Sequence, residues 1–474
     1  MRFSCWNGCK PDLPLILSFY KNQGRVSKRA LYCLLGLLAF VPVAQAESVQ
    51  FTPQQISDYQ ATPESERVRL LIELSKTGHQ DEAEALLKKF PLQGPHGANR
   101  TLYVQGLIME ARHDLIGAAR SFRYALASDP KLTLVRSDLV QVLMQLDESD
   151  SAKHHLKLLQ ADAPSSEQAA NIRSFIDKID ESHPYYFSGF INIAPSTNIN
   201  SGSSHNTVYS AITGSNWDIA AANKAQSGLG ITAGLNAGYS KRLGNHFQGV
   251  LAANIATSLY GDYAFDSIST SESGEMRYLL DQGFVSVGAV FSQGLDPASR
   301  TLTYNSYGPR VAMNYQLDQR NLLKGSIVDE YRNYINTPFQ NGWVLTSDLA
   351  LTHAIDSSMN FTTFGGYQDV GAGVASLAYQ SYYGGVNFYK EMPAGVTLDL
   401  TAQARFSGFK GPAVFAGTTR ADQRYSASAT LTKRDLNLLG FAPSLEYTYT
   451  LNKSNIALYD FDSHSINLNL TKDF

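Results

Sequence analysis

Two periodicities of apolar residues divide this chain. From about Gln54 to Ile179, Ala, Leu, Glu and Lys recur every three to four residues and Gly is scarce, which is the pattern of amphipathic helices. After Pro184, apolar and polar residues alternate with a period of two, and Gly, Asn, Asp and Ser interrupt the alternation. Clear examples are Val396–Phe406, Tyr425–Thr432 and Leu445–Thr450. The chain is therefore predicted to be helical first and then all β.

The alternating part is predicted to be a transmembrane β-barrel. A soluble β-sandwich also alternates, but it does not normally continue for so many strands with charges on its inner face. A barrel in a bilayer must alternate, because its outside meets hydrocarbon and its lumen meets water. Composition agrees, since only 17% of the residues are charged while Tyr (26), Phe (23) and Gly (36) are abundant, as in barrels with aromatic girdles and tight turns.

The links between the expected strands alternate in length. The short links are Lys241–Asn245, Asp281–Gly283, Asp318–Asn321, Asp356–Ser358, Lys390–Gly395 and Arg434–Leu438. The long links are Pro195–Gln226, Gly261–Ser271, Gly294–Arg300, Asn336–Asn341, Gly371–Ser376, Lys410–Asp422 and Leu451–Asp462. These links predict a 14-stranded antiparallel barrel. The first strand is expected to begin, and the last strand to end, on the periplasmic side. One long strand over Glu275–Ser292 is the alternative that would break the alternation.

The helical part is predicted to contain tetratricopeptide-like repeats. Small, large and Pro positions recur about every 34 residues, as in that repeat, and the matching residues are Ala83, Leu87, Pro95, Gly106, Ala118, Phe122, Ala125, Pro130, Ala152, Leu156 and Pro164. A capping helix is expected over Asn171–Ile179, ending at His183-Pro184. On this repeat frame Arg100, Tyr103, Ser137 and Gln141 face inward. They form a candidate groove that could bind an extended polypeptide, called the client below. An ordinary α-bundle is the alternative.

The N-terminal segment of the chain is predicted to be a signal peptide for export. Leu31–Val43 is apolar, follows Lys28-Arg29 and precedes Ala44-Gln45-Ala46, and its length is well under the roughly 20 residues of a membrane span. This pattern predicts a signal peptide over residues 1–46, followed by a helical domain at 47–183 and the barrel at 184–474. Val26 is an alternative start of translation. All three cysteines lie before residue 47, so the mature chain would have no disulfide and no Cys–metal site.

The last strand is predicted to guide the barrel into the membrane. Its alternate apolar residues and its terminal aromatic residue form the expected signal for the outer-membrane insertion machinery, and these are Ile466, Leu468, Leu470 and Phe474. The partners expected from this part of the chain are therefore that machinery and the lipid bilayer.

Catalytic and metal-binding motifs are absent. His154-His155 is a poor metal pair because adjacent helical residues point to different faces, and Ser347 and His353 are too far apart on one strand for a triad. No enzyme activity, cofactor or metal is expected, and a net charge of −3 indicates no nucleic-acid partner. Charged residues expected in the lumen are Lys324, Glu330, Arg332, Asp399, Arg405, Arg424 and Glu446. They either fill the lumen with ion pairs or line a substrate path.

The mature chain resembles the surface lipoprotein assembly modulator (Slam) family of Gram-negative outer membranes. The resemblance rests on the domain order and on short strings, which are Pro195–Asn200, Tyr307–Arg310, Ser454–Ile456 with Tyr459, and Thr471–Phe474. It implies an exporter that moves a client lipoprotein, or a secreted haem- or metal-binding protein, from the periplasm to the cell surface. A passive porin with a periplasmic interaction domain is the competing hypothesis.

Overall fold

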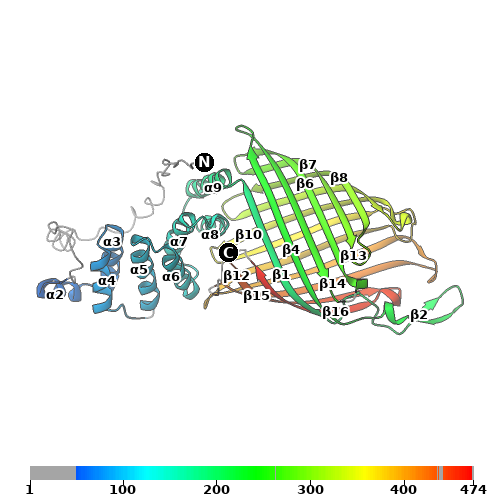
Figure 1. The fold of residues 1–474 in the computed structure, drawn as a ribbon, viewed down its shortest axis with the longest axis horizontal. Coiled ribbons are helices and arrows are strands. Elements are labelled where there is room, and N and C mark those ends of the chain that lie inside the picture. Colours follow the sequence, from blue (N-terminus) through cyan, green and yellow to red (C-terminus); the bar gives the residue numbers. More distant parts are fainter. Residues whose placement is uncertain (1–49, 95, 262, 435, 437–440, 472–474) are drawn as a thin grey trace, which may run out of the picture. The chain divides into compact units, whose positions relative to one another are not determined.

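The computed structural model describes residues 50–94, 96–261, 263–434, 436 and 441–471. Helices precede strands in it, as the sequence predicts (Figure 1). The chain divides into two compact units, of which unit 1 is Met1–Ala125 with Leu134–Leu146 and unit 2 is Leu126–Thr133 with Asp147–Phe474. The predicted signal peptide and Phe474 lie outside the described residues. The predicted domain boundaries therefore stay predictions.

Eight helices form the first part of the chain among the described residues, and α4, α6, α8 and α9 are clearly amphipathic. They are α2 (Pro53–Ala61), α3 (Glu64–Lys76), α4 (Gln80–Lys89), α5 (Gly97–Ala111), α6 (Leu115–Ser128), α7 (Thr133–Gln145), α8 (Ser149–Ala161) and α9 (Ser166–Ser182). Thr52 opens α2 with a capping box formed with Gln55. In unit 1 the Phe122 ring lies against Gly106, where a Cβ atom would come within 2.3 Å of it. This close approach fits a small-and-large pairing of helices, while the tetratricopeptide-like repeat itself stays a prediction.

Fourteen strands close into an antiparallel barrel within unit 2. They are β1 (Tyr185–Ser196), β4 (Gly228–Arg242), β5 (Phe247–Leu259), β6 (Ser267–Leu280), β7 (Gly283–Asp296), β8 (Thr301–Gln316), β9 (Asn321–Tyr334), β10 (Gly342–Asp356), β11 (Met359–Val370), β12 (Tyr379–Met392), β13 (Val396–Ala413), β14 (Thr418–Lys433), β15 (Ala442–Ser454) and β16 (Phe461–Thr471). Each strand pairs with its neighbours in sequence, and β1 closes the barrel by pairing with both β16 and β4. The predicted strand number is confirmed.

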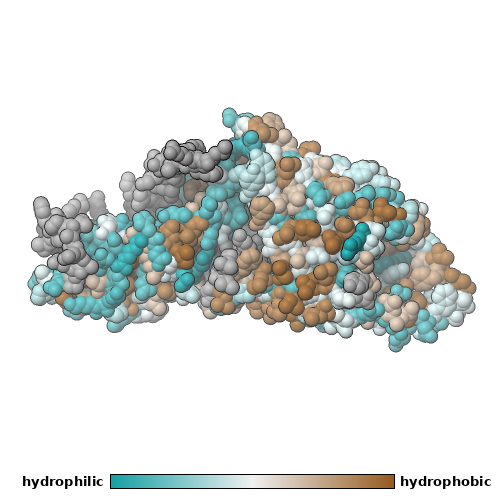
Figure 2. All heavy atoms as spheres, viewed as in Figure 1, coloured by the Kyte–Doolittle hydropathy of each residue, from teal (hydrophilic) through white to brown (hydrophobic). Residues whose placement is uncertain are grey.

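The strands place apolar side chains on the outer wall and polar ones in the lumen. On β16, Leu468 and Leu470 are 53% and 55% exposed on the outer wall, whereas Asn467 donates a hydrogen bond to the lumen residue Glu446. Figure 2 shows hydrophobic side chains gathered over the strands. An apolar outer wall of this kind is what a bilayer requires.

The links follow the predicted order but do not alternate regularly in length, because those at 297–300 and 414–417 are as short as the one at 317–320, and the one at 434–441, much of which lies outside the described residues, is longer than predicted. Asp281 and Gln282 form the tight turn between β6 and β7, so Glu275–Ser292 is two strands. The predicted links Gly261–Ser271, Lys410–Asp422 and Leu451–Asp462 are too long, because β6, β13, β14, β15 and β16 all extend into them. In these segments the strands stay paired by hydrogen bonds, although apolar and polar residues no longer alternate regularly. The prediction relied on that alternation and therefore ended the strands too early. The longest link contains a small hairpin of β2 (Thr207–Ser210) and β3 (Ser215–Asp218).

Candidate functional site

The α8–α9 pair covers one end of the barrel lumen within unit 2, and we call this the helical end. The two helices are joined by a short turn, after which the Ser165 side chain caps α9 by accepting from the Gln168 N–H. Lys153 Nζ on α8 contacts Asp150 at 2.8 Å and Asp180 of α9 at 2.9 Å. This shared cation fixes the two helices to each other.

Polar contacts attach the α8–α9 pair to the rim of the barrel. Arg242 at the end of β4 pairs with Glu181 of α9 at 2.9 Å. Arg173 Nη1 of α9 donates to the Asp281 carbonyl at 3.2 Å, and the Ser357 N–H donates to Asp162 Oδ2 at 3.1 Å. These contacts lie at three different turns or strand ends, so the helix pair spans the opening.

A second set of contacts surrounds the buried carboxylate of Glu391 on β12. Its Oε1 atom lies 3.1 Å from Arg434 Nη1 and 3.8 Å from His154 Nε2 of α8. Nearby, Lys131 Nζ pairs with Asp356 at 2.8 Å, and the Gly395 N–H donates to the Ala127 carbonyl. A buried carboxylate needs such partners, so this cluster ties the helical segments to the rim at β10, β12 and the turn after β14.

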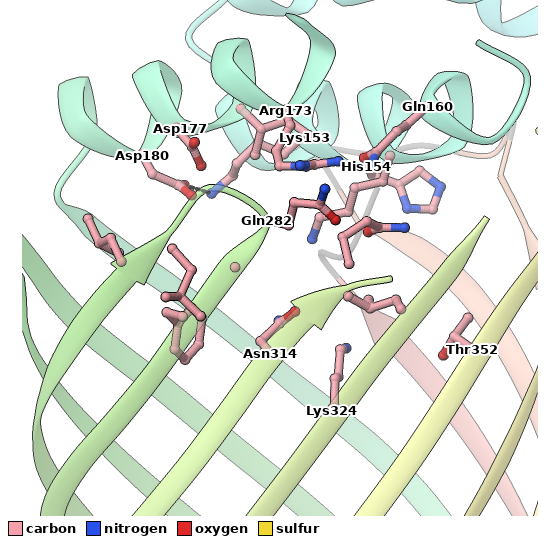
Figure 3. Close-up of a pocket in the computed structure, with 18 of the residues that line it drawn as sticks. Lys153, His154, Gln160, Arg173, Asp177, Asp180, Gln282, Asn314, Lys324 and Thr352 are labelled. Carbon is pink, nitrogen blue, oxygen red and sulfur yellow. Dashed lines mark hydrogen bonds and ion pairs between the residues drawn. The ribbon is translucent and has the colours of Figure 1, made fainter. Parts of the chain in front are cut away.

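A cavity of about 700 Å³ lies between the helix pair and the strands (Figure 3). Residues of β1 and of β4 to β12 line it together with α8 and α9. Lys157 of α8 and Lys324 of β9 both line this cavity, and neither makes a hydrogen bond or an ion pair with any residue that the structure describes. Figure 3 shows Lys324 pointing from its strand towards the helices.

All seven charged residues predicted for the lumen alternate with outward-facing neighbours and so face inward. Only Glu330 and Arg332 pair with each other, at 2.5 Å. Arg405 instead lies over the Tyr383 ring and donates to Gln368 and Ser381, and Arg424 donates to Asn452. Arg405 and Arg424 are thus held by aromatic and amide groups, whereas elsewhere in the lumen Glu275 pairs with Arg277 and Asp422 with Arg420.

Near the helical end, the charges that lack an ion-pair partner are separated across the lumen. In the strand order of the barrel, β9 lies seven strands from β16, and β6 to β9 face β13 to β16. Lys324 and Asp399 are each the fourth residue of their strand from the helical end. Asp399 accepts from Asn387, and Glu446 accepts from Asn467, with no cation paired to either among the described residues. Near the helical end, Lys324 of β9 therefore faces a wall that carries Asp399 and Glu446, while Arg405 and Arg424 lie farther along that wall from the helices.

The candidate groove residues lie in unit 1. Arg100 pairs with Glu64 at 2.6 Å, Tyr103 donates its hydroxyl to Asp138 at 2.6 Å, and Ser137 and Gln141 are half-buried. The groove remains a prediction, in which at least two of the four residues have partners inside the unit.

The sequence analysis missed a charged cluster around Asp138, which is 5% exposed. Lys76 Nζ lies 3.0 Å from its carboxylate. Burial, followed by the charge of Asp138, raises the pKa of Glu110 on α5 to about 7. The signal was not visible in the sequence, because Lys76, Glu110 and Asp138 come from three different helices.

Two of the strings that carry the family resemblance meet at the other end of the barrel. Asn198 is buried and donates from Nδ2 to the carbonyls of Gly202 and Asp462. Ser203 donates to the Ala457 carbonyl at 2.6 Å, and Ile456 packs with Val208 and Ile219 in a small core. These strings are separated by some 250 residues in the sequence, yet they build one folded cap of loops beside the β1–β16 junction.

The weak catalytic candidates have structural partners. His353 contacts Asn321 at 2.9 Å, and the Ser347 hydroxyl donates weakly to the Tyr367 carbonyl at 3.5 Å. His154 and His155 stack edge to face. Within the residues that the structure describes, no group of three His, Cys, Asp or Glu side chains is placed to hold a metal. No helix in the same residues is long and apolar enough to cross a membrane.

The chain matches the model of a known family. The profile of the family described as "Surface lipoprotein assembly modifier" matches residues 185–474. A protein of that name from Pasteurella multocida (strain Pm70) is 21% identical over 428 residues, which cover 86% of this chain and 82% of the relative.

Solved structures with some likeness include outer-membrane channels. The channel DcaP of Acinetobacter baumannii is 11% identical, with a TM-score of 0.35, over 60% of this chain and 96% of that one. Salmonella typhi OmpF, in complex with daunomycin, is 8% identical, with a TM-score of 0.34, over 61% and 98% of the two chains. At these TM-scores the likeness has no bearing on function.

Proposed function

Because the chain belongs to the surface lipoprotein assembly modifier family, we propose that it is an outer-membrane exporter. It moves a client lipoprotein, or a secreted haem- or metal-binding protein, from the periplasm to the cell surface. The helical end faces the periplasm, the helices before α8 bind the client, and the insertion machinery places the barrel in the bilayer.

The observation that carries the proposal is the covered lumen. A closed barrel of 14 strands is covered at its helical end by α8 and α9, and individual polar contacts attach these helices to the rim. Partly exposed ion pairs contribute about 0–1 kcal/mol each. A cover held in this way is suited to opening when a client engages the preceding helices.

The covered lumen also distinguishes the exporter from the passive porin. A porin needs an open path at rest, whereas here α8 and α9 line a cavity at one mouth of the lumen. Nothing in the sequence suggests an energy source, so we expect export to draw on folding of the client outside the cell or on partner machinery.

Deletion of residues 48–146 tests the proposal. This deletion removes the helices that precede α8 and keeps the α8–α9 pair on the barrel. We expect normal amounts of inserted barrel, scored by heat-modifiable migration in gels, and loss of client display on the surface. Normal display by the truncated protein would contradict the proposal. The matched control is the full-length chain with Lys178→Gln, an exposed position on α9.

A further inference from the structure

The cavity at the helical end contains cations that lack counter-ions. Most basic groups near the helix pair are engaged, since Lys153 contacts Asp180, Arg173 contacts a carbonyl and Arg242 contacts Glu181. Lys157 and Lys324 are different, because neither has a hydrogen-bond or ion-pair partner among the described residues, although both line the same cavity and Asp177, Asp281 and Asp356 also line it.

The positions of the two ammonium groups are electrostatically unfavourable. Burial lowers the pKa of Lys157, and the nearby charges of Lys324 and Lys153 lower it further. One charge is carried by the helix pair and the other by the barrel wall. An anion that contacts both would remove the repulsion between cover and wall.

The rest of the cavity suits a polypeptide better than a small ion. Side-chain amides from several strands and turns line it, and these are Gln248, Gln282, Asn314, Gln316, Gln319 and Asn360. Amides both donate and accept hydrogen bonds, as a peptide backbone requires. Across the lumen, Asp399 and Glu446 would repel a negatively charged segment towards the β9 wall.

We propose that Lys157 and Lys324 bind the carboxylate groups of an acidic polypeptide segment that enters the lumen at the helical end. The inference rests on the proposed function, because the segment is taken to belong to the client. Binding there links recognition to the cover, since the segment bridges α8 and the barrel wall.

The test uses the purified full-length protein in detergent and a fluorescent peptide of alternating Glu and Ser. Its counterpart of alternating Gln and Ser is the neutral probe. We expect the acidic peptide to bind at least about tenfold more tightly, and the Lys157→Gln/Lys324→Gln variant to lose about tenfold in affinity, as for loss of charge-assisted hydrogen bonds. Lys178→Gln, which removes a lysine outside the cavity, should bind like the parent.

Several outcomes would overturn the inference. Equal binding of the acidic and neutral peptides to the parent protein would overturn it. This comparison needs no variant, so it remains valid if the double variant folds poorly. Unchanged binding by a double variant that keeps heat-modifiable migration also overturns it. Inorganic phosphate is the third probe, and binding of phosphate with no preference for the acidic peptide would indicate a small-anion site instead. If the acidic peptide binds but the client is not displayed on the surface, only the proposed export is contradicted. If the client is displayed but the peptide does not bind, only this inference is contradicted.

Discussion

Glu181 of α9 and Arg242, the last residue of β4, form an ion pair with 2.9 Å between Oε1 and Nη1. Both side chains are about 40% exposed, so the pair contributes on the order of 0–1 kcal/mol. The Asp162–Ser357 contact is a single hydrogen bond of similar strength. These two links between the helix pair and the rim are therefore individually weak.

Weakening these links should open the lumen. We expect the Arg242→Ala/Asp162→Ala variant to shift the barrel towards conducting states by roughly tenfold, the effect of losing about 1–2 kcal/mol of closure. Planar-bilayer recordings measure this. Lys178→Ala is the matched control, and equal conductance of the two variants would contradict the role of α8 and α9 as a cover.

The two faces of β16 should respond oppositely to a charge. Leu468→Lys places a charge on the outer wall and should cost up to about 2–4 kcal/mol at mid-bilayer depth. Asn467→Lys places it beside Glu446 in the lumen and should be tolerated. Urea unfolding of the barrel in lipid vesicles compares them, and equal destabilisation would show that the outer wall does not face lipid.

The charged walls of the lumen should set ion selectivity. In the variant with the opened cover, Asp399→Asn/Glu446→Gln should shift the reversal potential towards anions, because Lys324 on β9 then dominates the charge near the helical end. Lys324→Gln should shift it the opposite way. If both changes left the reversal potential unmoved, these side chains would not line the conducting path.

The cluster in unit 1 should make its stability depend on pH. Folding raises the pKa of Glu110 from 4.5 to about 7, so the folded state holds a proton that the unfolded state releases in this range. Stability is therefore highest below about pH 4.5 and is lost as pH rises through about 7. In Glu110→Gln, the free energy of unfolding should fall by roughly 1–3 kcal/mol less over this pH range than in the parent. Urea unfolding followed by circular dichroism measures it. Glu66→Gln, at an exposed position, is the control, and an unchanged pH dependence in Glu110→Gln would contradict the assignment.

Much of the barrel follows from local sequence, whereas the site does not. Alternation along Val396–Phe406 dictates which residues face lipid, so Asp399 and Arg405 could be assigned to the lumen. Whether they are neutralised depends on contacts between strands, and Arg405 is held by Tyr383 rather than by an acid. The amphipathic pattern of α8 predicts a helix but not its partner. Lys157 and Lys324 line one cavity only because the barrel closes beneath the helix pair. No periodicity in the sequence indicates that these two residues share a cavity.

Surface display of the client is the most direct test of export. A lipoprotein encoded beside this chain is co-expressed with it or without it, and protease is added to intact cells. We expect the client to be degraded only when this protein is present, while a periplasmic marker stays protected. Equal degradation of the client in cells that lack the protein would contradict export by this protein.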